Sequence, residues 1–191
     1  MDILNGQDAL VVLVYPMDGS EASAFILARV AGGENMTEWA FESAEPADLE
    51  SVRKLLSEAA LPVEDIAGLL PHFLLAKQGG RVIGCIGLEP RGEFALLRSL
   101  AVAFSFRGRG IGRALCDRMI NRARGQGIKT LYLLTTTAEG FFLQQGFFRI
   151  DREGVPAEIR STEEFKSLCP ETAVCLVRRI NSFPSRGLPP S

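Results

Sequence analysis

The sequence predicts one α/β (α+β) domain over residues 37–180, built on a mixed sheet flanked by helices. Two observations predict this class. Short β-type apolar runs follow one another before residue 103, and a long amphipathic helix then lies between two further apolar runs. Paired strands followed by a strand–helix–strand unit give one sheet of mixed strand direction. A length of 191 residues suits one compact domain with a hydrophobic core.

The expected strands are apolar runs bounded by turn signals. They cover residues 11–15, 25–30, 39–43, 73–77, 81–88, 93–102, 130–135 and 173–178. The first two flank the turn signal Asp18-Gly19-Ser20, so we expect residues 1–36 to form an accessory strand pair. Gly79-Gly80 predicts that the fourth and fifth runs form a β-hairpin.

The expected helices carry apolar residues three or four positions apart. They cover residues 46–59, 111–126, 139–145 and 161–168. Pro46 favours the first helical position, and Ser161 with Glu164 fits a capping box. Beyond them, Pro, Ser and Gly predict a flexible tail over residues 181–191.

Composition argues against several classes of protein. A net charge of -2 disfavours a general nucleic-acid or membrane-surface binder. One histidine, His72, and four scattered cysteines predict neither a metal site nor a disulfide framework. No signal peptide or span-length apolar run is recognisable, so we expect a soluble, cytoplasmic protein without a metal.

A turn rich in glycine and arginine precedes the best helix. It consists of Arg107, Gly108, Arg109, Gly110, Ile111, Gly112 and Arg113. Unpaired amides at a helix N-terminus favour an anion, and glycines let the backbone approach a diphosphate. A P-loop needs Gly-Lys-Ser/Thr, which is absent, and a Rossmann fingerprint lacks its acidic residue. The turn therefore predicts a polyphosphate ligand such as coenzyme A, with a structural turn as the alternative.

Several strings together resemble the GCN5-related N-acetyltransferase (GNAT) family over roughly residues 37–178. They are Leu100-Ala101-Val102, Arg107-x-x-Gly110-x-Gly112, the strand 131–134 and Phe142-x-x-x-Gly146-Phe147. The Q/R-x-x-G-x-G/A pattern of this family binds the coenzyme A pyrophosphate. The resemblance therefore implies the family's mostly antiparallel mixed sheet, an acetyl-CoA co-substrate and direct acetyl transfer to an amine.

Longer strings resemble two narrower groups. Residues 97–102, 133–142 and Cys169-Pro170 are similar to acetyltransferases encoded in bacterial arsenic-resistance operons, while residues 134–136, 142, 146–147 and 156 resemble the acetyltransferase domain of N-acetylglutamate synthases. Both imply a small acidic amino acid or a toxic arsenic- or phosphorus-containing analogue as the acceptor. Alternatives are glutamate acetylation in arginine biosynthesis, although no amino-acid-kinase-like domain is recognisable, and a non-catalytic acetyl-CoA sensor. The family's frequent dimers allow a homodimer, and the sequence leaves the oligomeric state open.

The resemblance also implies site residues. Backbone groups of Leu100, Ala101 and Val102 are expected to bind the pantetheine arm. Glu89 and Glu93, or a water held by either, are the candidate bases, and a solvated strand-end carboxylate is the structural alternative for each. Glu139 is a further candidate.

For the acceptor we expect Arg98 to grip an acid group with its guanidinium fork, beside Ser99, Thr135 and Thr136. A surface arginine and threonines that cap a strand end are the alternatives. The family's frequent tyrosine acid is missing, because Phe141 and Phe142 occupy that stretch. We expect Cys169 and Cys175 to be small core hydrophobes rather than an arsenic site.

Overall fold

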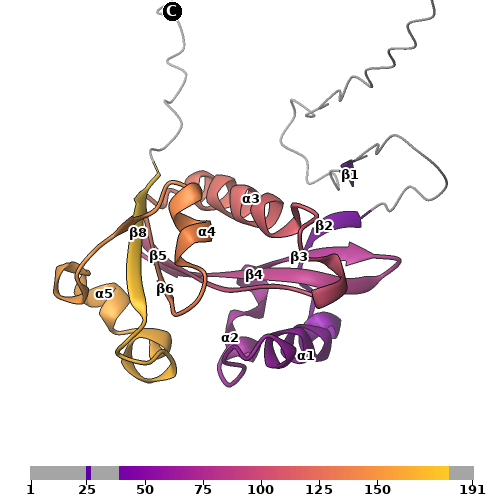
Figure 1. Cartoon of the computed structure of the whole chain (residues 1–191), viewed down its shortest axis with the longest axis horizontal. Coiled ribbons are helices and arrows are strands. Elements are labelled where there is room, and N and C mark those ends of the chain that lie inside the picture. The colour runs from indigo at the N-terminus through magenta and orange to yellow at the C-terminus, as the bar shows by residue number, and fades with distance from the viewer. Residues whose placement is uncertain (1–24, 27–38, 181–191) are drawn as a thin grey trace, which may run out of the picture.

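A computed structural model describes residues 25–26 and 39–180 (Figure 1). The strands of these residues form one sheet in the order β1-β2-β3-β4-β5-β6-β8-β7. Their bounds are β1 Phe25–Ile26, β2 Trp39–Ser43, β3 Phe73–Gln78, β4 Arg81–Arg91, β5 Phe94–Val102, β6 Thr130–Thr135, β7 Phe148–Arg149 and β8 Val174–Arg179. Neighbouring strands are antiparallel except β5 and β6, which are parallel. The predicted α+β class with a mostly antiparallel mixed sheet is confirmed.

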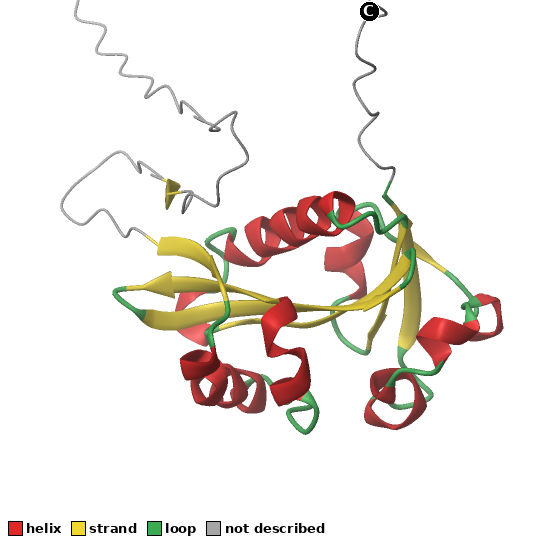
Figure 2. Cartoon of the chain, turned by 180° about the vertical axis from the view of Figure 1, so that it is seen from behind, coloured by secondary structure: helices red, strands yellow, loops and turns green. Residues whose placement is uncertain are grey.

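Helices cover both faces of the sheet (Figures 1 and 2). Their bounds are α1 Leu49–Glu58, α2 Ile66–Leu69, α3 Ile111–Gly125, α4 Glu139–Gln144 and α5 Ala157–Arg160, with a π-helical turn at Glu164–Leu168. Figure 1 shows α3 and α4 on one face, with α1, α2 and α5 on the other. Among the described helices, none is long and apolar enough to cross a membrane.

Apolar periodicity in the sequence builds the core on each face. On the α3 face, Leu115 and Met119 are fully buried in one cluster with Ile86 of β4. On the other face, Val52 and Leu56 of α1 belong to a cluster with side chains of β3. Removing each such side chain from water contributes roughly 1.5–3 kcal/mol to folding. The two apolar layers hold the sheet, and so the strand ends, in a fixed geometry.

The parallel strands β5 and β6 pair over only part of their length. Their partners are Phe94 with Thr130, Ala95 with Leu131 and Leu96 with Tyr132. Beyond these pairs β5 continues to Val102 and β6 to Thr135 without pairing to each other. The backbone groups of β5 that face β6 are therefore left without a strand partner over this stretch.

A β-bulge lies in the same part of β5. Cys85 of β4 pairs with Ala101 and Gly87 pairs with Arg98, so three steps along β5 match two along β4. Ser99 takes a φ of +56°, a left-handed conformation that is uncommon for a residue with a side chain. The bulge turns β5 at the point where it leaves β6.

The C-terminal helical region corrects one prediction. No capping box forms at Ser161, whose hydroxyl donates to the carbonyl of Glu158, and the predicted helix is replaced by α5 and the π-helical turn. Thr162 accepts from the amide of Phe165 instead, and the Glu164 carboxylate lies beside Arg98. The sequence prediction also missed α2 and β7, which are too short to show a periodic pattern.

The predicted terminal segments lie largely outside the described residues. The strand 11–15 and the tail 181–191 fall there entirely. Of the predicted strand 25–30, Phe25 and Ile26 are described and pair with β2. The prediction of an accessory strand pair over residues 1–36 stays untested.

Candidate coenzyme and acceptor site

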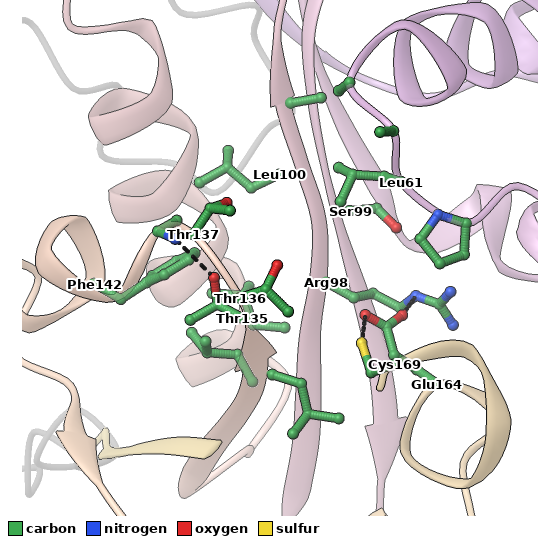
Figure 3. A pocket seen from close by; sticks show the side chains of 18 of the residues that line it. Leu61, Arg98, Ser99, Leu100, Thr135, Thr136, Thr137, Phe142, Glu164 and Cys169 are labelled. Carbon is green, nitrogen blue, oxygen red and sulfur yellow. Dashed lines mark hydrogen bonds and ion pairs between the residues drawn. The ribbon is translucent and has the colours of Figure 1, made fainter. Parts of the chain in front are cut away.

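A pocket of about 510 Å³ opens where β5 and β6 separate. It is lined by residues 59–62 after α1, 97–102 of β5, 133–138 at the end of β6, and residues 107, 112, 141, 142, 164 and 168–170. Figure 3 shows Leu100, Phe142 and the threonines 135–137 on one side of β5, with Arg98, Glu164 and Cys169 on the other. The pocket therefore joins the α3 face of the sheet to the α1 face.

The predicted anion-binding turn, residues 107–113, leads into α3 and is called the anion-binding turn below. Gly108 and Gly110 have φ of +76° and +80°, which favours glycine. Gly110 is the N-cap, its carbonyl accepts from the amide of Ala114, and no side chain caps the helix. The amides of Ile111, Gly112 and Arg113 thus precede the first intrahelical bond and lie at the positive end of a 15-residue helix. This geometry suits a diphosphate.

The three arginines of the turn differ in their placement. Arg107 lines the pocket, and its Nε donates to the carbonyl of Val102 at 3.0 Å. Arg109 lies over the ring of Phe106, and Arg113 lies 4.0 Å from Asp117 on an exposed face of α3. Only Arg107 of the three is part of the pocket wall.

The residues predicted to bind the pantetheine arm line the pocket along β5. Leu100 and Val102 are half-buried there, while the side chain of Ala101 is buried in the core beneath α1. Ser99 is also in the wall, and its carbonyl accepts from the thiol of Cys85 at 3.4 Å. The structure thus brings residues 99–102 together with the anion-binding turn.

The end of β6 supplies hydroxyl and aromatic groups. Thr135 accepts from the amide of Ala138 at 3.0 Å, so its hydroxyl shapes the turn before α4. Thr136 is exposed in the pocket wall. The rings of Phe141 and Phe142 pack edge to face, with their centroids 5.1 Å apart.

Tyr132 lies in the core beneath α5, away from the pocket wall, and burial raises its pKa. The lining residues therefore include no tyrosine.

Arg98 is at the centre of a charge cluster made of Arg98, Arg91, Asp65, Glu89 and Glu164. It is called the buried charge cluster because Arg98, Glu89 and Glu164 are buried, while the side chains of Asp65 and Arg91 are 24% and 40% exposed. The Arg98 side chain is 0% exposed. Its Nη1 and Nη2 donate to the two oxygens of Asp65 at 2.5 and 2.8 Å, and Nη1 also donates to Glu89 at 3.3 Å. Burial lowers the pKa of Arg98, but Glu164, Asp65 and Glu89 outweigh it and raise the pKa overall. The guanidinium is permanently charged within this cluster.

These contacts correct the predicted role of Arg98. It does lie in the pocket wall, but the fork expected to grip a substrate acid group already holds Asp65 in a bidentate pair. A substrate carboxylate would have to displace a carboxylate of the protein. Asp65 is the N-cap residue of α2, and its side chain makes no cap hydrogen bond because it turns to Arg98 instead.

The predicted bases lie away from the pocket. Glu89 is buried and accepts from Arg91 at 2.5 Å, behind Arg98. Glu93 is half-exposed at the opposite end of β5 and accepts from Lys129 at 2.6 Å. Glu139 pairs with Arg149 on the surface of α4, and this pairing lowers its pKa. None of the three carboxylates is in the pocket wall.

Sequence reasoning missed the loop Ala59–Pro62 and two polar residues of the pocket wall. Glu164 and Cys169 both line the pocket, and the Cys169 thiol donates to Glu164 Oε1 at 3.6 Å. The expectation that Cys169 is a core residue is wrong, whereas Cys175 is buried as predicted. Burial and the neighbouring Glu164 carboxylate raise the pKa of Cys169 to about 12, so it remains a thiol. The Ser161–Glu164 spacing suggested a helix cap and concealed the pocket role of Glu164.

Comparisons with known proteins agree with this geometry. The model of the "Acetyltransferase (GNAT) family" matches residues 34–147. The amino-acid acetyltransferases of Pseudomonas aeruginosa and Ectopseudomonas mendocina are 30% and 31% identical over 81% and 76% of the chain. The chain spans only 38% and 36% of their lengths.

Solved structures share the fold. N-acetylglutamate synthase from Neisseria gonorrhoeae, complexed with coenzyme A and N-acetyl-glutamate, has a TM-score of 0.66 at 23% identity over 75% of this chain and 35% of that one. Rv2747 from Mycobacterium tuberculosis, in complex with CoA and NLQ, has a TM-score of 0.64 at 23% identity over 74% of this chain and 99% of that one. The family predicted from the motifs is confirmed: the chain belongs to the acetyltransferase (GNAT) family.

Proposed function

We propose that the chain is an acetyl-CoA-dependent N-acetyltransferase that transfers the acetyl group directly to the amino group of a small amino-acid-like acceptor. One observation carries the proposal: the pocket between β5 and β6 has the anion-binding turn at one end and opens on the α1 face at the other. The amino-acid acetyltransferases among its relatives support the acceptor class.

The coenzyme would enter from the α3 face. The amides of Ile111 to Arg113 and the side chain of Arg107 would hold the pyrophosphate. The pantetheine arm would then run along residues 100–102, where the β5 backbone lacks a strand partner. This path brings the thioester to the bulge at Ser99, between the two faces of the sheet.

Transfer needs no covalent enzyme intermediate. The nitrogen lone pair of the acceptor attacks the thioester carbonyl carbon, and an amide of β5 stabilises the oxyanion that forms. The carbon–sulfur bond then breaks and the thiolate leaves. A thiol with a pKa of ~8.5 leaves without much help from an acid, which fits a pocket wall without a tyrosine.

A narrower proposal concerns the acceptor. The resemblance to arsenic-resistance enzymes supports an acidic amino acid or a toxic analogue, and the resemblance to N-acetylglutamate synthases supports glutamate. Because Asp65 occupies the guanidinium fork of Arg98, Arg98 offers no free guanidinium to glutamate or to a toxic analogue. The resemblance alone supports an acidic acceptor and a role in detoxification. The resemblance is likewise what supports a homodimer.

Free-thiol release from acetyl-CoA, measured with a panel of amines, tests the proposal. The panel holds glutamate, glutamine, phosphinothricin, arsinothricin and a simple primary amine, with a no-acceptor control. Release with one or more acceptors, matched by the N-acetyl product in mass spectrometry, supports the transferase. Coenzyme binding without thiol release across the panel supports the sensor instead.

A further inference from the structure

The buried charge cluster contains more carboxylates than guanidinium groups. Asp65, Glu89 and Glu164 surround Arg98, and Glu89 also meets Arg91, which leaves one negative charge in excess among these residues. A buried charge without a full partner is costly. A cation that entered the pocket beside this cluster would balance it.

Glu164 is the carboxylate of the cluster that faces the pocket. Asp65 and Glu89 are not in the lining, whereas Glu164 is, with 9% of its side chain exposed. Its Oε2 lies 2.6 Å from Arg98 Nε but is not aligned for a hydrogen bond. Its Oε1 accepts only from the thiol of Cys169 among the described residues. Since a thiol is a weak donor, Oε1 retains acceptor capacity for a stronger one.

We infer that Glu164 is the residue that binds the ammonium group of the acceptor and takes its proton. The inference rests on the proposed transferase function and replaces Glu89 and Glu93 as candidate bases. It assigns the acceptor end of the pocket, Glu164 with Cys169 and the loop Ala59–Pro62, to a primary ammonium ion.

The proton balance is complete. One N–H bond of the ammonium breaks and its proton passes to Glu164 Oε1, which frees the lone pair that attacks the thioester. After the carbon–sulfur bond breaks, the second proton of the nitrogen goes to the thiolate through solvent. Glu164 finally returns its proton to water, so that the net products are the amide, free coenzyme A thiol and one proton.

The surroundings of Glu164 favour such a role. Burial raises its pKa, Arg98 and the Cys169 hydrogen bond oppose this, and the charges of Asp65 and Glu89 raise it further. The net direction is upward, toward the working pH of a base. Arg98, held by Asp65 and Glu89, is then a positioning residue that keeps the Glu164 carboxylate in the pocket wall.

The test compares Glu164→Gln with the matched control Glu163→Gln, one residue away and exposed. The acceptor is the best one from the panel, and kcat/KM is measured from pH 5.5 to 10. Wild type is expected to show a plateau between the pKa of Glu164 and that of the amine, because the carboxylate and the ammonium are the reacting forms. The pH profile of Glu163→Gln is expected to coincide with that of wild type.

Glu164→Gln is expected to lose at least about 100-fold in kcat/KM at pH 7. Its profile should climb about tenfold per pH unit up to the pKa of the amine, since solvent must then supply the neutral amine. Coenzyme A affinity should stay within about twofold of wild type, because the anion-binding turn is untouched. A purely structural role would lower the whole curve and leave its shape unchanged.

The outcomes separate the two proposals. If wild type releases no thiol with any amine, the transferase proposal fails and this inference with it. If wild type turns over and Glu164→Gln keeps both the wild-type rate and the plateau, only this inference is overturned.

A second variant covers the case in which Glu164→Gln does not fold. Glu164→Asp keeps the charge but withdraws the oxygens by ~1.5 Å, and at least a tenfold loss of kcat is expected. A wild-type kcat for a folded Glu164→Asp also overturns the inference.

Discussion

The two ends of the pocket are built in different ways. The anion-binding turn is one continuous stretch, residues 107–113, that offers backbone amides and mostly exposed arginines. The buried charge cluster takes its members from β4, β5, the N-cap of α2 and the π-helical turn. A ligand bound at the first end meets groups fixed by local backbone geometry. A ligand bound at the second meets groups that only folding assembles.

The two ends of the pocket also differ in how much their charges contribute to stability. Exposed charges such as Arg113 and Asp117 contribute roughly 0–1 kcal/mol to stability, because water screens them. In the buried charge cluster, removing one partner leaves the remaining charges without a counter-charge where little water can replace it. Changes to the exposed arginines of the anion-binding turn should therefore affect binding with little cost in stability, while changes in the cluster should affect both.

The largest effect is expected for Arg98→Ala. Three carboxylates would lose their shared cation, and we expect the free energy of unfolding to fall by about 3–5 kcal/mol in urea titrations at pH 7. Arg53→Ala is the control, because Arg53 pairs only with the exposed Glu50 on α1, and its change should stay within about 0.5 kcal/mol. A loss below about 1 kcal/mol for Arg98→Ala would show that the cluster is not held by its guanidinium.

A smaller effect is expected for Gly110→Ala. At a φ of +80° a Cβ is strained although nothing crowds it, so stability should fall by about 1–2 kcal/mol. Coenzyme A should bind about tenfold more weakly, since the first amides of α3 shift. Gly140→Ala in α4 also has open space, at an ordinary φ, and should not lose stability. Equal results for both variants in calorimetry and unfolding would contradict the assigned role of the turn.

The smallest effect is expected for Phe141→Tyr, which adds a hydroxyl to a residue of the pocket wall, in the stretch where the resembled family often has a tyrosine. Because a thiolate leaves easily, kcat should change by less than about threefold. Phe148→Tyr on the exposed edge strand β7 is the control. An increase of about 100-fold in Phe141→Tyr alone would mean that protonation of the leaving thiol limits the wild-type enzyme.

Sequence reasoning succeeded where the physical signal is local. The apolar periodicity predicted α3 to within one residue, and the strand 130–135 coincides with β6. The glycine- and arginine-rich turn over residues 107–113 was likewise placed correctly between strand and helix, because its glycines, its arginines and the start of α3 are all encoded within seven residues. Its binding of an anion stays a prediction. Such features need no distant partner.

Sequence by itself thus determined the family, the order of the longer strands and helices, and the glycine- and arginine-rich turn before α3. Only the tertiary structure decided the other end. Asp65 lies 33 positions before Arg98, and Glu164 lies far beyond it in the chain, so no spacing rule could pair them. The pairing of β4 with β5 also decided that Glu89 forms an ion pair with Arg98, while Glu93 lies at the end of β5 away from the pocket. The physical reason is that the cost of burying a charge depends on which partners the fold brings to it.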